Sequence, residues 1–82
     1  MTRTEMLEII NGIFREAFDD DSLVITEKTY SGDIEDWDSL MQITLVTAVE
    51  DRFNIAFLLK DVTSMQNVGD MMDIIEREMS KA

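Results

Sequence analysis

The sequence of 82 residues contains no histidine, no cysteine and no proline. Without histidine, a serine nucleophile lacks the general base that usually takes its proton near neutral pH, so no Ser-His-Asp site can be built. Without cysteine, disulfides, thiolate metal sites and thiol catalysis are excluded, and nothing indicates an oxidising compartment. We therefore expect a protein that is not an enzyme and whose fold depends on packing alone.

Positive charge and long apolar runs are also scarce. Seven Lys and Arg residues face 18 Asp and Glu residues, which gives a net charge of −11. This charge repels phosphate backbones and excludes nucleic acid, whereas it suits either a basic protein partner or a surface that only keeps the domain soluble. No stretch reaches membrane-spanning length, and residues 1–5 are charged where a secretory signal would be apolar, so we expect a cytoplasmic protein without membrane insertion.

The length allows one small domain over residues 1–82, and a hydrophobic content of 45% supports a single modest core in a monomer. The apolar periodicities predict an all-α fold of three longer helices and one short helix, with a long loop between the first and second helices. The first helix is expected over residues 3–18, with Thr2 and Glu5 as a capping box. Its apolar face comprises Met6, Leu7, Ile10, Ile13, Phe14, Ala17 and Phe18.

Residues 19–38 lose the helical period and predict an ordered loop, which is long enough to suggest a functional role. Asp19, Asp20 and Asp21 do not form a calcium loop, because Leu23 and Val24 occupy positions where a ligand and a glycine are required. We expect no metal site. The side chains expected to fix the loop to the core are Leu23, Val24, Ile25, Tyr30, Ile34 and Trp37.

The second helix is expected over residues 39–53, with Asp38 as its N-cap and Asn54 near its C-terminal end. Its predicted inward face comprises Ile43, Leu45, Val46, Val49 and Phe53. An outward stripe begins beside Ser39 and consists of Leu40, Thr44, Thr47 and Asp51.

A short helix is expected around residues 59–63, and Asn67 with Asp70 predicts the start of a last helix that ends near residue 79. The inward face of this last helix comprises Val68, Met71, Met72, Ile75 and Met79. The seven methionines recur at core spacing, so we interpret them as flexible core filler rather than as a binding surface.

Ser39 is the residue of greatest chemical interest, because it lies in Asp38-Ser39-Leu40 at the start of an amphipathic helix. A phosphate ester on this serine would lie beside unpaired backbone N–H groups and the positive end of the helix dipole. Asp21-Ser22-Leu23 repeats the tripeptide, but no amphipathic helix follows it, so we interpret Ser22 as a turn residue. Ser39 is therefore predicted to be modified by another enzyme.

The motif at residues 38–40, the helix over residues 41–53 and the closing segment Val68 to Ile75 closely resemble an acyl carrier protein over nearly the whole chain. The resemblance implies a four-helix bundle that carries 4′-phosphopantetheine on Ser39, with Asp38 and Leu40 as the rest of the motif. A phosphopantetheinyl transferase would attach the cofactor from coenzyme A. The cofactor thiol would then hold acyl groups as thioesters for loading and transferring enzymes.

The sequence departs from carriers of general fatty-acid synthesis, because Met41 and Thr44 stand where that class is often acidic. These departures favour a specialised carrier in a polyketide-like, lipid or surface-modification pathway, with Trp37 as an anchor of the loop or a contact for the acyl chain. Two alternatives remain, namely an aminoacyl carrier of the D-alanyl or peptidyl type and an unmodified acidic helical adaptor. Partner choice is predicted to reside on Leu40, Met41, Thr44, Thr47, Glu50 and Asp51.

Overall fold

The computed structural model describes residues 1–81 and contains four α-helices in that range, with no strand. They are α1 (Arg3–Ala17), α2 (Ser39–Phe53), α3 (Leu59–Ser64) and α4 (Val68–Met79), and a short 3₁₀ turn, η1 (Ser31–Asp33), interrupts the loop before α2. The predicted all-α fold of three longer helices and one short helix is confirmed. None of the helices is long and apolar enough to cross a membrane.

Local capping groups determine where the helices begin and end. Thr2 Oγ1 accepts from the Glu5 backbone N–H at 3.1 Å, while the Glu5 carboxylate accepts from the Thr2 N–H at 2.8 Å, so the predicted capping box is present. Asn67 accepts from the Asp70 N–H at 2.8 Å and begins α4 in the same way. Where α1 and α2 end, Asp19 and Asn54 adopt left-handed φ values of 51° and 56°, a role that glycine usually fills.

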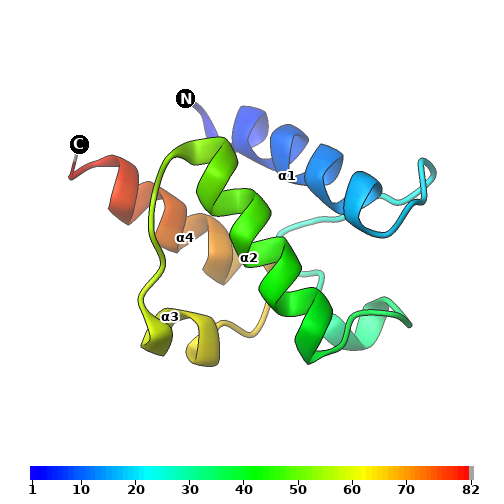
Figure 1. Cartoon of the computed structure of the whole chain (residues 1–82). Helices are drawn as coiled ribbons and strands as arrows, with labels where there is room; N and C mark the ends of the chain where they lie inside the picture. Colours follow the sequence, from blue (N-terminus) through cyan, green and yellow to red (C-terminus); the bar gives the residue numbers. More distant parts are fainter. Residues whose placement is uncertain (82) are drawn as a thin grey trace.

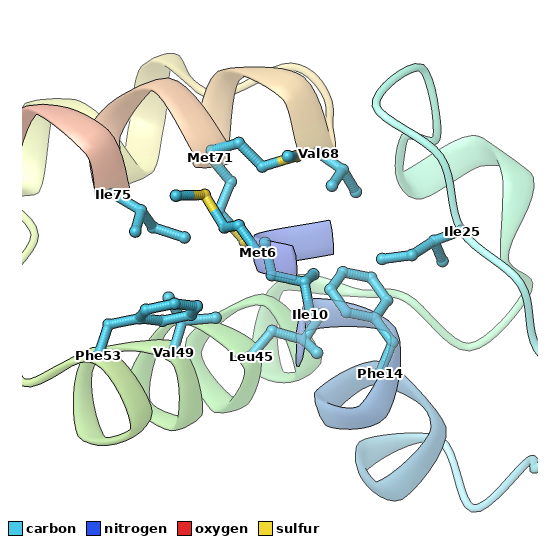
Figure 2. Close-up of a cluster of buried hydrophobic side chains, with 11 residues drawn as sticks. Met6, Ile10, Phe14, Ile25, Leu45, Val49, Phe53, Val68, Met71 and Ile75 are labelled. Atoms are coloured by element: carbon cyan, nitrogen blue, oxygen red, sulfur yellow. The ribbon is translucent and has the colours of Figure 1, made fainter. Parts of the chain in front are cut away.

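Helices α1, α2 and α4 lie around one another (Figure 1), and the hydrophobic core fills the space between them. One loop residue, Ile25, joins this core from the side (Figure 2). Met6, Met71 and Met72 are among its buried side chains, and Met41, Met65 and Met79 pack against it, which confirms that methionine mainly fills this core. The remaining core residues are Ile10, Phe14, Leu45, Val49, Phe53, Val68 and Ile75.

One residue of α2 lies on the opposite side of the helix from the prediction. Ile43 was expected to face inward, but its side chain is 60% exposed, whereas Leu45 is fully buried. Successive residues lie about 100° apart around an α-helix, so Ile43 and Leu45 point in directions about 160° apart and cannot both enter the core. Because Leu45, Val46, Val49 and Phe53 are buried, Ile43 is left on the solvent side of the helix.

The loop before α2 is held by one buried polar side chain and two backbone contacts. Asn11 Oδ1 accepts from the Ile25 N–H at 2.8 Å, and Asn11 Nδ2 donates to the Ile25 carbonyl at 3.2 Å. The Val68 and Gly69 N–H groups of α4 donate to loop carbonyls at 2.9 and 2.7 Å, and a Cβ atom at residue 69 would lie only 3.0 Å from the Glu27 oxygen. These bonds satisfy helix-end donors while fixing the loop.

The side chains predicted to fix this loop to the core are confirmed only in part. Ile25 is buried, and Leu23, Ile34 and Trp37 are half-buried against the core. Val24 and Tyr30, however, are 71% and 51% exposed, so the prediction for these two residues was wrong. In an extended loop, neighbouring side chains point to opposite sides, and burial of Ile25 turns Val24 outward.

Candidate functional site

Ser39 is the first residue of α2, and its side chain is exposed. Its hydroxyl makes no hydrogen bond with any other residue in the described part of the chain. Asp38, the predicted N-cap, accepts from the Met41 N–H through Oδ1 at 2.8 Å. The predicted motif geometry is therefore present, with a capped helix start and an accessible serine hydroxyl.

The backbone around Ser39 suits a phosphate ester. The N–H groups of Ser39 and Leu40 belong to the first helical turn, which has no preceding carbonyls to accept from them. Asp38 takes the Met41 donor, and the Asp38 carbonyl takes the Gln42 donor at 2.9 Å. Two first-turn donors, at the positive end of the helix dipole, thus remain for an anionic group on the neighbouring serine.

A cleft of about 520 Å³ opens directly beside this serine. Its walls come from the loop, from α2, from α3 and from the start of α4, and its volume lies in the range of small-molecule pockets. Apolar side chains from all four elements alternate with amides and hydroxyls around it. The lining residues are Ser31, Trp37, Asp38, Ser39, Gln42, Ile43, Val62, Thr63, Met65, Gln66, Asn67 and Met71.

Trp37 both anchors the loop and lines the cleft. Its ring packs edge-on against Phe14, with the ring centres 5.2 Å apart, and lies 6.4 Å from the ring of Phe18. Its Nε1–H donates to Oε1 of Gln42 at 2.7 Å. The two interpretations considered for Trp37 are thus compatible, because one edge of the indole faces the core and the same side chain contributes to the cleft.

The predicted partner stripe is exposed on the outer side of α2. Leu40 is 73% exposed, and Thr44, Thr47 and Asp51 are also exposed. The Thr44 hydroxyl donates to the Leu40 carbonyl at 3.2 Å, within the same helix. The helical spacing of four, three and four residues correctly predicted which side of α2 these residues share.

The two further residues predicted to determine partner choice, Met41 and Glu50, are less accessible than the stripe. Met41 is half-buried and packs against the core, because it follows the inward side of α2 that Leu45 defines. Glu50 is also half-buried, and its Oε2 accepts from the Phe57 N–H at 2.7 Å, which ties it to the segment after α2. Neither is a freely exposed side chain, and Ile43 is the exposed residue that extends the stripe.

Ser22, in the second Asp-Ser-Leu tripeptide, has a different setting from Ser39. It lies in a turn, and both its N–H and its hydroxyl donate to Asp20 Oδ1, at 3.0 and 2.6 Å. Its hydroxyl is occupied locally, and no helix begins at this residue. The turn predicted for Ser22 is confirmed.

The acidic charge lies mainly away from the outer side of α2. Residues 19–38 contain eight carboxylates and one lysine, whereas residues 39–53 contain two carboxylates and one arginine. One of those two carboxylates is Glu50, which is bonded to the Phe57 backbone. The surface next to Ser39 on α2 therefore carries apolar and hydroxyl groups rather than a row of acids.

Sequence patterns did not identify the polar cleft residues Ser31, Gln42, Gln66 and Asn67 as a group. They come from three separate segments that the fold brings together, so no local spacing connects them. One local signal existed, because Gln42 follows Ser39 by three residues and such residues share a helix face.

Comparison with known proteins gave one kind of match. No family model and no curated protein matches the sequence. A solved structure of holo acyl carrier protein from Geobacter metallireducens, determined by solution NMR, superposes with a TM-score of 0.85. It is 37% identical in sequence, and the match covers 92% of this chain and 86% of that chain.

This likeness extends over most of both chains and includes sequence as well as fold. The chain belongs to the acyl carrier protein family. It is accordingly a carrier and not an enzyme.

Proposed function

We propose that this carrier holds acyl intermediates as thioesters on a 4′-phosphopantetheine arm attached to Ser39. The observation that carries the proposal is the exposed Ser39 hydroxyl at the first turn of α2, beside free helix donors and at the edge of the cleft. The chain has no thiol of its own, and the arm would supply one. The similar Geobacter protein is a holo form, that is, a carrier with its prosthetic group attached.

The residues around Ser39 have distinct parts in this proposal. Asp38 caps α2 and fixes the serine at the first turn, while Leu40 presents an apolar side chain next to it for a phosphopantetheinyl transferase. The transferase takes the arm from coenzyme A, and the ester phosphate then lies near the N–H groups of Ser39 and Leu40. Residues 1–82 act as one monomeric carrier domain that delivers its cargo to loading and transferring enzymes.

An acyl cargo fits the cleft better than an aminoacyl cargo. Val62, Met65 and Met71 supply apolar lining, and the charged residue among the lining side chains is an aspartate, Asp38, next to the attachment point. An ammonium group deep in the cleft would find no second carboxylate among the lining residues and would lose hydration. A flexible methionine lining also suits a chain that enters and leaves.

Partner recognition is proposed to use the outer side of α2, comprising Leu40, Ile43, Thr44, Thr47 and Asp51. Because these side chains are mainly apolar or hydroxylic, docking should depend less on salt than docking on an acidic helix. This composition supports a specialised pathway rather than general fatty-acid synthesis.

Replacing Thr44 and Thr47 with Glu should preserve the fold, because both are exposed, and should raise the loading rate with a fatty-acid-synthesis malonyl transferase. Equal loading rates for fully modified wild type and variant would contradict the assignment of partner recognition to this surface.

The first test of the proposed function is chemical. The purified protein is incubated with a broad-specificity phosphopantetheinyl transferase and coenzyme A, and its intact mass is measured. A single cofactor adduct that can then be acylated on its thiol supports the acyl carrier. Persistent absence of an adduct would instead support the unmodified acidic adaptor, whose interactions depend on charge alone.

A further inference from the structure

The carboxamide of Gln42 is held in one orientation by Trp37. The indole N–H of tryptophan can only donate, so the atom of Gln42 that faces it at 2.7 Å must be the carbonyl oxygen. Trp37 itself is fixed, because its ring packs edge-on against the fully buried Phe14. The Gln42 side chain is therefore oriented by a residue anchored in the core.

This orientation directs the amide nitrogen of Gln42 away from Trp37, its side-chain partner. Gln42 Nε2 carries two N–H groups, and neither donates to an acceptor within residues 1–81. The residue is half-buried and lines the cleft. It lies three residues after Ser39, on the same helix face, so the free donors are close to the point where the arm would begin.

Most other polar groups of the cleft are occupied or unfixed. The Thr63 hydroxyl donates to carbonyls of its own helix. Asn67 Oδ1 caps α4 by accepting from the Asp70 N–H, which leaves the Asn67 Nδ2 group as a second oriented donor, at the start of α4. Gln66 is exposed, and no hydrogen bond from another described residue holds its side chain. Gln42 thus combines a fixed orientation with an available donor on the helix that Ser39 begins.

The chemistry around Gln42 favours a neutral acceptor. The lining contains no lysine or arginine, and Asp38 adds a carboxylate, so an anionic group would meet repulsion without a counter-charge. A carbonyl oxygen accepts an amide N–H without needing such a charge. A hydrocarbon chain that covered the Gln42 amide would exclude water from its N–H groups without replacing the lost hydrogen bond, which is unfavourable.

We propose that the Gln42 amide N–H, oriented by Trp37, binds a carbonyl oxygen of the prosthetic arm or of its cargo. The inference rests on the proposed attachment of the arm to Ser39. The arm contains amide carbonyls, a loaded chain adds a thioester carbonyl, and a 3-oxo chain adds a further ketone. Gln42 is then a positioning residue at the cleft. If the bound group is the ketone, the Gln42 donor also favours 3-oxo cargo over cargo that lacks a ketone.

The side-chain amide signals of Gln42 in ¹⁵N-labelled protein test this directly. Spectra are compared for the unmodified, holo, hexanoyl and 3-oxohexanoyl forms, and each form is verified by intact mass. A downfield shift of one Gln42 N–H signal is expected in at least one modified form. If the shift first appears in the holo form, Gln42 binds a carbonyl of the arm. If it first appears in the hexanoyl form, Gln42 binds the thioester carbonyl, and if it first appears in the 3-oxohexanoyl form, Gln42 binds the ketone. Absence of this shift in all three modified forms would overturn the inference, whereas absence of the mass adduct would overturn the proposed function instead.

A matched set of variants tests the role of the donor. Gln42→Glu keeps an oxygen for Trp37 but removes the free N–H, and Gln66→Glu adds the same charge to the cleft without touching an oriented amide. With a ¹³C label at the bound carbonyl, Gln42→Glu should lower the ratio of bound to free carbonyl roughly two- to tenfold, the range of one net hydrogen bond. Gln66→Glu should match wild type.

Trp37→Phe tests the orientation of Gln42 separately, because it retains an aromatic ring against Phe14 while removing the indole N–H. It should weaken the carbonyl shift, since Gln42 would no longer be held. Wild-type carbonyl shifts in both Gln42→Glu and Trp37→Phe would overturn the assigned role. If Gln42→Glu fails to fold, Trp37→Phe and the wild-type spectra still decide the question.

Discussion

Arg77 of α4 donates two hydrogen bonds to the carboxylate of Asp61 in α3, with Nη2 2.6 Å from Oδ2 and Nη1 3.1 Å from Oδ1. Asp61 is the buried residue of α3, and its Oδ2 also accepts from the Leu58 N–H at 3.1 Å. One carboxylate therefore caps the short helix and ties it to α4. Because Val62 and Thr63 of α3 line the cleft, this pair holds one cleft wall in position.

Replacing Asp61 with Asn should loosen α3 selectively. The variant keeps the side-chain shape but loses the charge that pairs with Arg77, and one amide cannot accept both hydrogen bonds. Amide hydrogen exchange should accelerate over residues 59–64 while α1 and the centre of α2 stay protected. Asp73→Asn is the matched control, because that carboxylate is exposed and pairs with Arg3 rather than with Arg77. Equal exchange in the two variants would contradict the role of Asp61.

The same pair predicts an effect of acid. The hydrogen bonds from Arg77 lower the pKa of Asp61, and Lys81 together with Arg77 lowers the pKa of Glu78. A carboxylate with a lowered pKa in the fold contributes stability that is present above its unfolded pKa and is lost as the pH falls through its folded value. Exchange in α3 should therefore accelerate below the ordinary aspartate range in wild type, and Asp61→Asn should show a smaller change. A pH response of equal size in both proteins would exclude Asp61 as its source.

The outward position of Ile43 is tested by two substitutions on opposite sides of α2. Leu45 is fully buried, so Leu45→Ala should destabilise by about 2–5 kcal/mol. This is a large part of the roughly 4–12 kcal/mol expected for a domain of this length. Ile43 is 60% exposed, so Ile43→Ala should cost no more than about 0.5 kcal/mol. Urea unfolding of both variants measures the difference, and similar losses would mean that Ile43 is part of the core.

The start of α2 predicts separable effects of shape and charge at Asp38. Asp38→Ala removes the bond to the Met41 N–H and should cost about 1 kcal/mol of stability. Asp38→Asn should cost little, because asparagine caps helices about as well as aspartate. If modification of Ser39 slows equally in both variants, the transferase recognises the charge. If modification of Ser39 slows in the alanine variant alone, the transferase requires the capped helix start rather than the charge of Asp38.

The sequence predicted the helix boundaries well because capping is local. Thr2 with Glu5, Asp38 and Asn67 each act within four residues, so their effects can be recognised without knowledge of the fold. The position of Ser39 at the start of a helix was predicted from the same capping signals. The helix boundaries and the position of Ser39 do not depend on which helices pack against each other.

The outward position of Ile43 was harder to predict, because apolar residues surround the first two turns of α2. Leu40, Met41 and Ile43 are all apolar, yet only Met41 packs against the core. The choice is made by packing against α1 and α4, which the sequence of α2 alone does not contain. The orientation of Gln42 likewise depends on Trp37, whose own position is set by Phe14 in another helix.

The central claim is that Ser39 alone carries the arm. Wild type, Ser39→Ala and Ser22→Ala are each treated with a broad-specificity phosphopantetheinyl transferase and coenzyme A, and their intact masses are measured. The account predicts one cofactor adduct on wild type and on Ser22→Ala, and none on Ser39→Ala, whose fold is verified by circular dichroism. An adduct that persists on folded Ser39→Ala would contradict the assignment.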